Sequence, residues 1–297
     1  MGGMDHALTV ARGLRQPRAR SRLVHCQVRV GFCLALGLWG VAASRLAHAD
    51  DATSADPPAD SVEEDASRWC ADGLLALSEG VCAVVPPKLH EPLTVVIFLH
   101  GVVKPGTDWQ WAQQLAVARA ARAHGFVGVM PRGRRGYGPR GMEQWWTWPT
   151  SVKGQRALEA DLCTEWTMAE RALSGALGAS FERRYVFGFS NGAYYASSLA
   201  LRGRLDADGF GIFAGGSGAD YLVARAREVK RRAPIYVGYG DRDAVARRDA
   251  QKLGAALKSI GWPSRVVGRP RVGHAMTDSM VAEALDFLAA TVPHEGG

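Results

Sequence analysis

One short stretch of this chain constrains its fold most strongly: Gly188-Phe-Ser190-Asn-Gly192 lies between an apolar run and a segment of small and apolar residues. The apolar run, 185–187, has the composition of a strand, and residues 191–200 suit a helix. This order predicts a strand, a sharp turn and a helix, with Ser190 at the apex and glycines that let strand and helix pass closely. Ser190 is therefore the candidate nucleophile, although a Gly/Ser-rich turn without chemistry has the same five-residue pattern.

Buried-type strands alternate with helical patterns along the chain. Residues 93–99 form a continuous, largely β-branched run, which is typical of a central strand buried on both faces. The other predicted strands are 81–85, 126–130, 185–187, 209–214, 234–239 and 264–267, and the predicted helices are 109–124, 153–177, 191–200, 221–232, 244–260 and 276–291. Leu115 and Met168 belong to the apolar positions of their helices. The alternation predicts one α/β domain, a mainly parallel sheet with helices on both faces and no large cap, whose active residues lie at the carboxyl ends of the strands.

Residues 1–49 have the features of an export signal. They hold seven of the 36 basic residues and one of the 29 acidic residues, which accounts for nearly all of the formal net charge of +7. An arginine-rich region precedes an apolar run over 30–43 and the small-residue site Ala47-His48-Ala49, so we expect cleavage after Ala49. An uncleaved membrane anchor is the alternative, and Met4 is a second candidate start. The rest of the chain is nearly neutral, which gives no support to a nucleic-acid partner or to stable membrane insertion after cleavage.

The residues after the signal divide into a leader and a folded domain. Residues 50–68 begin with a run rich in Asp, Ala, Pro and Ser, so a flexible acidic leader is expected before a catalytic domain over 69–297. Cys70 and Cys82 flank a short segment and are expected to pair in an oxidising compartment. Cys163 falls in a helical pattern and is expected to be a buried thiol. No cysteine and histidine spacing is typical of a metal site, and no cofactor is expected.

A serine hydroxyl needs a base within hydrogen-bond reach, and the base needs an orienting acid. Of the five histidines beyond residue 49, His274 lies in the loop before the last predicted helix, at the expected active edge of the sheet, and is the predicted base. The acid is expected just after the strand 234–239. Asp243 is favoured there, and Asp241 is the alternative.

Two further segments are expected to shape the site. The N–H groups of Asn191, after the serine, and of Val102, after the central strand, are the expected oxyanion donors. His100 belongs to the same loop as Val102 and is a candidate substrate contact. The segment 131–151 is long for a plain connection, and its tryptophans either line a substrate cleft or pack the loop onto the body. These tryptophans are Trp145, Trp146 and Trp148.

The loop at His100-Gly101, the serine pentapeptide, Asp243 and His274 follow one another in an order that resembles the α/β-hydrolase superfamily over residues 90–292. Asn after the serine, together with the export signal, looks most like secreted esterases, a group that contains polyhydroxybutyrate depolymerases and feruloyl esterases. The resemblance implies a periplasmic or secreted serine hydrolase that cleaves small or oligomeric carboxylic esters through an acyl-enzyme. The chain differs from that group at 192–195, where more glycine is usual, and it has no evident polymer-binding module. A peptidase or amidase on the same triad and a catalytically silent binding protein are the alternative functions.

Overall fold

The structure is a computed structural model that describes residues 69–291. The predicted export signal, the predicted leader and the last six residues of the predicted domain lie outside the described residues. Within 69–291, no helix is both long enough and apolar enough to cross a membrane.

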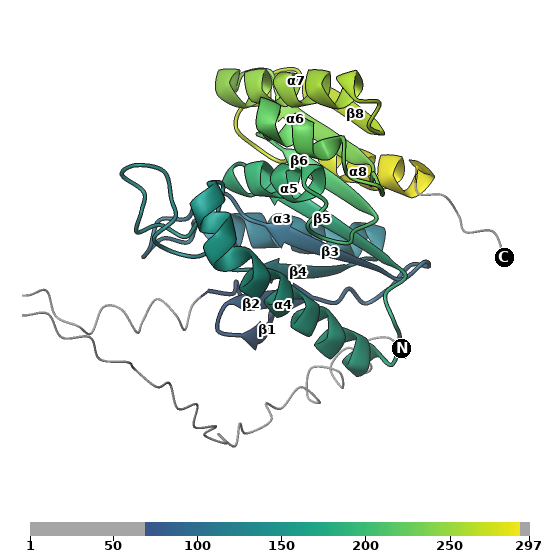
Figure 1. Cartoon of the computed structure of the whole chain (residues 1–297). Coiled ribbons are helices and arrows are strands. Elements are labelled where there is room, and N and C mark those ends of the chain that lie inside the picture. Colours follow the sequence, from purple (N-terminus) through teal and green to yellow (C-terminus); the bar gives the residue numbers. More distant parts are fainter. Residues whose placement is uncertain (1–68, 292–297) are drawn as a thin grey trace, which may run out of the picture.

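An eight-stranded sheet forms the centre of the domain, with the strand order β1-β2-β4-β3-β5-β6-β7-β8 (Figure 1). The strands are β1 (Leu75–Ser78), β2 (Val81–Val84), β3 (Thr94–Leu99), β4 (Val127–Pro131), β5 (Arg183–Phe189), β6 (Gly209–Phe213), β7 (Ile235–Gly240) and β8 (Ser264–Arg269). The pairs β1–β2 and β2–β4 are antiparallel, and every pairing from β4 to β8 is parallel. The predicted mainly parallel sheet is therefore confirmed, with β3 in its interior.

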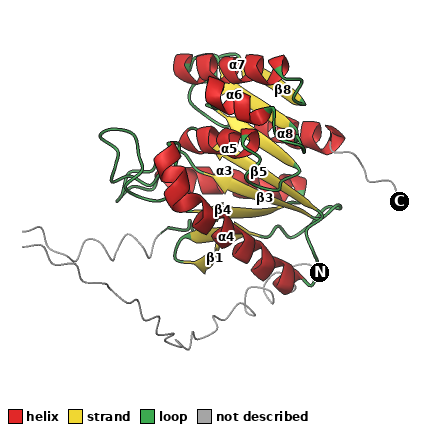
Figure 2. Ribbon diagram, viewed as in Figure 1, coloured by secondary structure: helices red, strands yellow, loops and turns green. Residues whose placement is uncertain are grey.

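Helices cover both faces of the sheet (Figure 2). The face on which each helix packs depends on the direction along the sheet in which the next strand is added. The helices are α3 (Trp109–His124), α4 (Val152–Leu177), α5 (Asn191–Leu201), α6 (Asp220–Ala226), α7 (Ala244–Ser259) and α8 (Asp278–Thr291). The step from β3 to β4 runs one way along the sheet, and the steps from β4 through β8 run the other way. Because parallel crossovers are right-handed, α3 packs on one face and α4 to α7 on the opposite face. Helix α8 returns to the face of α3.

The ends of the predicted elements agree with the structure to within two residues, apart from β1 and α6. Strand β1 was not predicted, because its four residues alternate between half-buried and exposed at the edge of the sheet and resemble a loop. Two predicted apolar helix positions face the solvent: Leu115 is 41% exposed and Met168 is 65% exposed. In α3 the polar Gln110 and Gln114 are buried instead, so hydrophobicity alone misplaces part of the inner face.

Helix α6 is shorter than predicted. The helical pattern extends over 221–232, but the helix ends at Ala226. The guanidinium of Arg231 binds aspartates in the segment 206–208, and Arg232 donates to the carbonyl of Ile260 at 2.7 Å. These two arginines, at the end of the predicted helix, are therefore tied to neighbouring segments.

Candidate active site

Ser190 occupies the sharp turn between β5 and α5, as the sequence predicts. Its backbone has φ 52° and ψ −116°, a conformation that residues with a side chain rarely adopt. Its N–H donates to the carbonyl of Phe213 at 2.9 Å, and its carbonyl accepts the N–H of Ala193 at 2.9 Å. The strained turn is thus held from the neighbouring strand β6 and from the first turn of α5.

Two glycines allow the segments around Ser190 to cross. A Cβ on Gly188 would lie 2.3 Å from the carbonyl oxygen of Gly192, and a Cβ on Gly192 would lie 2.0 Å from the carbonyl oxygen of Leu99. Both distances are far below van der Waals contact. Strand β5, the start of α5 and the end of β3 can therefore approach this closely only with glycine at both positions.

His274 and Asp243 contact each other at the same edge of the sheet. His274 lies between β8 and α8, and its Nδ1 contacts Oδ2 of Asp243, the residue that precedes α7. The second carboxylate oxygen accepts the N–H of Ala246 at 3.0 Å and caps α7. Asp241, the alternative acid, makes no side-chain hydrogen bond to His274 among the described residues.

The electrostatics favour an ionised Asp243. Burial raises the pKa of this carboxyl, but hydrogen bonds from the N–H of Ala246 and from His274 outweigh burial and bring the pKa below its usual value. A carboxylate only accepts hydrogen bonds, so the proton of a neutral His274 is on Nδ1. Nε2 is then left as the acceptor, which is the arrangement of a general base.

An aromatic contact joins His274 to the residue before Ser190. Its ring centroid lies 5.1 Å from that of Phe189, the residue before Ser190. Among residues 69–291 the Ser190 hydroxyl makes no hydrogen bond to His274. The structure therefore brings the two residues into one neighbourhood and shows the His274–Asp243 contact directly.

The loop that follows β3 packs against Ser190. A Cβ on Gly101 would lie 3.2 Å from the Cβ of Ser190, and the Gly101 N–H donates to Oε1 of Gln113 in α3 at 2.8 Å. Val103 exchanges two backbone hydrogen bonds with Trp146, at 3.1 and 2.9 Å. Val102 thus lies between two anchored residues. Gln113 is a residue that the sequence analysis missed, because nothing local links it to Gly101.

Asn191 supplies its side chain to the tryptophan loop. Its Oδ1 accepts the N–H of Trp148 at 2.7 Å, although it is the backbone N–H of Asn191 that the sequence analysis assigns to the oxyanion. Within the described part of the chain, neither this N–H nor that of Val102 donates to another residue. Both donors expected at the oxyanion are therefore unused.

His100 is an interior residue, contrary to its assignment as a substrate contact. It is 3% exposed, and burial lowers its pKa to about 4. Nδ1 donates to the carbonyl of Gly101, and Nε2 accepts the N–H of Gly133 at 2.9 Å. Both ring nitrogens are occupied, so His100 braces the loop after β3 against the loop after β4.

The three tryptophans have different environments. Trp148 is fully buried, stacks on Tyr195 at 6.1 Å and donates its indole N–H to the carbonyl of His100, so it packs the loop onto the body and lines no cleft. Trp146 is partly exposed, with the guanidinium of Arg132 at 4.3 Å from its ring centroid and that of Arg135 at 4.2 Å. The remaining indole, Trp145, is also partly exposed and meets Trp109 edge-on at 5.6 Å.

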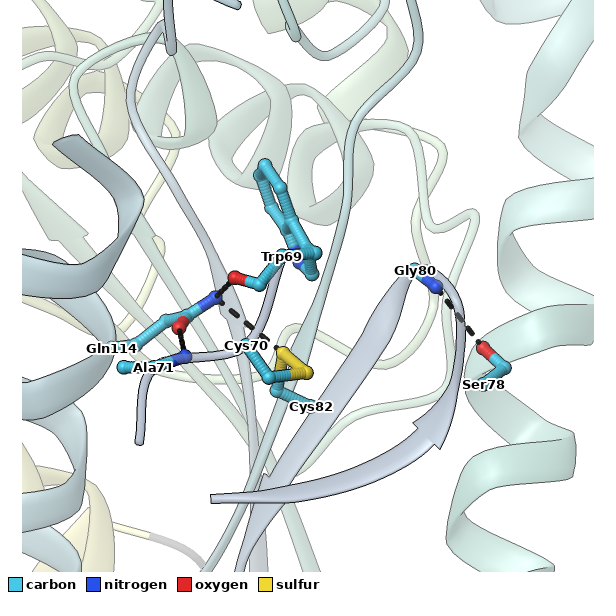
Figure 3. The surroundings of a disulfide bond; sticks show 7 residues. All are labelled: Trp69, Cys70, Ala71, Ser78, Gly80, Cys82 and Gln114. Carbon is cyan, nitrogen blue, oxygen red and sulfur yellow. Dashed lines mark hydrogen bonds between the residues drawn. A yellow bond between two sulfur atoms is a disulfide. The ribbon is translucent and has the colours of Figure 1, made fainter. Parts of the chain in front are cut away.

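The expected disulfide between Cys70 and Cys82 is present and closes a sequence separation of 12 residues (Figure 3). Gln114 of α3 fastens the same segment: it accepts the N–H of Ala71 at 2.8 Å and donates to the carbonyl of Trp69 at 3.1 Å. The Trp69 ring packs edge-on against the rings of both His100 and Trp146. The start of the domain therefore supports the loops beside Ser190.

Cys163 is half-buried and unpaired in disulfides among the described residues. Burial raises the pKa of its thiol. This agrees with its interpretation as a packing residue.

Comparisons with known proteins identify the fold. No family model and no curated protein sequence matches the chain. Among solved structures, acyl-protein thioesterase 2 of Zea mays is similar, with a TM-score of 0.53, 18% identity and coverage of 72% of this chain and 99% of the other. SOBER1 of Arabidopsis thaliana (TM-score 0.51, 14% identity, 66% and 98% covered) and the esterase PE8 (TM-score 0.50, 20% identity, 71% and 97% covered) are also similar.

At these identities the likeness concerns the fold. The sheet order, the helices on both faces and the similarity to these structures show that this chain has the α/β-hydrolase fold. The resemblance seen in the sequence is confirmed at this level.

Proposed function

We propose that the protein is a serine hydrolase that cleaves carboxylic esters with Ser190 as nucleophile, His274 as base and Asp243 as orienting acid. The observation that carries the proposal is the contact of Asp243 with Nδ1 of His274. The strained strand-to-helix turn at Ser190 and the contact of the His274 ring with Phe189, the residue before it, support the proposal. The names of two structural neighbours, an esterase and an acyl-protein thioesterase, support the hydrolysis of esters in general.

The proposed reaction has two halves. Ser190 Oγ attacks the ester carbonyl while Nε2 of His274 takes the hydroxyl proton, and the N–H groups of Asn191 and Val102 bind the oxyanion. The tetrahedral intermediate collapses, the C–O bond to the alcohol breaks, and His274 returns the proton to the leaving oxygen. Water then attacks the acyl-enzyme by the same route and releases the carboxylic acid. Asp243 stays ionised throughout and stabilises the imidazolium.

The substrate is proposed as a small or oligomeric ester that contacts Trp145 and Trp146, the two indoles of the loop that reach the surface. The closer likeness to polyhydroxybutyrate depolymerases and feruloyl esterases stays a prediction. An alcohol of low pKa can leave as its anion without first taking a proton from His274. Esters of such alcohols are therefore the substrates of choice for a first assay.

The test combines a p-nitrophenyl ester panel with a fluorophosphonate probe. We expect turnover of the esters and labelling of Ser190, and we expect Ser190→Ala and His274→Ala each to lower turnover by several orders of magnitude. Near-normal rates in either variant would end the proposal. Labelling with turnover of amides only would indicate a peptidase, and a folded protein that is neither labelled nor active would indicate a binding protein.

We also propose that the protein is exported, with residues 1–49 removed as a signal and the catalytic domain acting in the periplasm or outside the cell. The disulfide between Cys70 and Cys82 supports this, because such bonds persist in oxidising compartments. Edman sequencing of the exported protein should begin at Asp50. A mature chain that starts before residue 40 would contradict the signal.

A further inference from the structure

A groove with a cavity volume of about 1190 Å³ lies between helices α4, α5 and α6, apart from the proposed active site. Its lining includes Ala200, at the last turn of α5, whereas Ser190 precedes the first turn of that helix. The 11 residues of α5 span roughly 16 Å at 1.5 Å per residue. The groove is larger than the roughly 300–1,000 Å³ of most small-molecule sites, and no step of the proposed reaction uses it.

Part of the groove lining is apolar and exposed. Val152 of α4 and Tyr221 of α6 are lining residues, and each is 51% exposed. Phe210 and Trp262 also belong to the lining, but they are only 2% and 4% exposed and offer almost no surface to a ligand. Val152 and Tyr221 can therefore contact a hydrocarbon or aromatic body.

The walls are basic. They carry six cationic and three anionic side chains, namely Arg156, Arg202, Arg204, Arg225, Lys230 and Arg231 with Glu159, Asp206 and Glu228. Their formal charges leave a surplus of three positive charges, and a low-dielectric groove of one sign attracts ions of the other sign.

One buried carboxylate fixes two of these arginines. Glu159 is 5% exposed and contacts both Arg202 and Arg204. Burial raises the pKa of Glu159, but the hydrogen bonds from the two arginines outweigh it and lower the pKa overall. The three groups together keep a net positive charge, held in place at the wall of the groove.

Two further cations have no anionic partner. Arg156 of α4 and Lys230, just beyond α6, form no ion pair with another residue of the described range 69–291, and both are exposed. Arg231 is paired with Asp206 and Asp208, so it adds no free charge. Arg225 forms an exposed pair with Glu228 at 3.4 Å, which holds this arginine weakly. Unpaired positive charge and exposed apolar side chains therefore line the same groove.

We propose that this groove is a second binding site, for an amphiphilic anion whose apolar body lies against Val152 and Tyr221 and whose carboxylate or phosphate group meets Arg156 and Lys230. Such a ligand satisfies both surfaces at once, whereas a neutral apolar ligand leaves the cations unused and a cationic one is repelled. The site is independent of the ester hydrolysis proposed above.

The test is calorimetric titration of the folded protein with octanoate, octyl phosphate, 1-octanol and octyltrimethylammonium. We expect the wild type to bind at least one of the two anions about tenfold or more tightly than 1-octanol, and to show no binding of the cation. The comparison of octanoate with octyl phosphate tells which head group the site prefers. Raising the salt from about 50 to about 500 mM should weaken only the binding of the anions.

Charge variants locate the site. Arg156→Gln/Lys230→Gln should weaken anion binding about tenfold and leave 1-octanol unchanged. The matched control Arg122→Gln/Arg265→Gln removes the same charge from exposed positions outside the groove. This control should change neither the binding of the anions nor the binding of 1-octanol. The proposal would be overturned by equal affinity for all head groups, by the same loss of anion affinity in both double variants, or by no saturable binding. It would also be overturned if anion binding disappeared when a fluorophosphonate blocks Ser190.

Discussion

At the scale of single residues, Asp243 serves two elements with one carboxylate. Oδ1 caps α7 and Oδ2 contacts His274, so substitutions can separate the two roles. Asp243→Asn keeps an acceptor for the cap but loses the charge that orients His274, and we expect turnover to fall about 10⁴-fold with little change in stability. Asp243→Ala should show a similar fall in turnover and in addition lose about 1 kcal/mol of unfolding free energy. The measurements are ester turnover and urea unfolding.

Asp241→Asn is the matched control for these two variants. Among the described residues its side chain makes no hydrogen bond to His274, so turnover should stay close to that of the wild type. A large loss of turnover in Asp241→Asn, with normal rates in Asp243→Asn, would reverse the assignment of the acid.

His100 makes stability depend on pH. Burial lowers its pKa in the folded protein to about 4, whereas an unfolded histidine has the ordinary value of 6.5. Below pH 6.5 the unfolded chain therefore takes up a proton that the folded protein refuses until about pH 4. The stability present above pH 6.5 is lost as the pH falls, by about 2 kcal/mol at pH 5.

Urea unfolding at pH 7.5 and pH 5 tests this dependence. We expect the wild type to lose about 2 kcal/mol more than His100→Gln over this interval. An NMR titration of the His100 ring in the folded wild type is a direct check that needs no variant. A midpoint near 6.5 would contradict the buried, neutral histidine.

At the scale of elements, the crossing of β3 with α5 depends on Gly192. A Cβ there would lie 2.0 Å from the carbonyl oxygen of Leu99, so Gly192→Ala must push the helix away from the strand. We expect a loss of about 1–3 kcal/mol or more in unfolding free energy, with a loss of turnover because Ser190 moves with the helix. Thermal and urea unfolding measure the first effect, and ester assays measure the second.

Gly175→Ala is the counterpart in an uncrowded helix. Gly175 lies in α4 with no heavy atom within 4 Å of a built Cβ, so alanine adds helix propensity without a clash. We expect a gain of about 0.5–1 kcal/mol and unchanged turnover. Equal responses at the two glycines would show that backbone entropy, and not the crossing, governs Gly192.

The same scale shows what a local pattern can predict. Strand β3, Thr94 to Leu99, lies within the apolar run 93–99. The apolar composition of this run is sufficient to predict an interior strand. The edge strand β1 and the end of α6 are different cases. Their lengths depend on contacts made by distant segments, such as those of Arg231 with 206–208, and such contacts leave no periodic signal in the chain.

At the scale of the whole molecule, the disulfide ties the start of the domain to the sheet. Cys82 lies in β2, and Cys70 is adjacent to Trp69, whose ring packs on His100. We expect Cys70→Ser/Cys82→Ser to lower the unfolding free energy by about 2–3 kcal/mol. Reductant should destabilise the wild type by a similar amount and leave the double variant unchanged. Alkylation of both cysteines in the wild type without prior reduction would contradict the disulfide.

The sequence by itself determined the alternation of strands and helices, the parallel sheet and the strand-turn-helix around Ser190. Each of these follows from local composition: a β-branched run favours a strand, and the glycines beside Ser190 permit a turn that other residues resist. The same local information placed His274 and the two candidate acids in loops at one edge of the sheet.

Only the tertiary structure decided which aspartate contacts His274, at a sequence separation of 31 residues. It also decided that His100 and Trp148 lie inside the molecule, and that Arg156 and Lys230 flank one groove. The physical reason is the same in each case. Composition sets what a segment prefers over a few residues, whereas the partner of a side chain depends on how helices and strands far apart in the chain pack together.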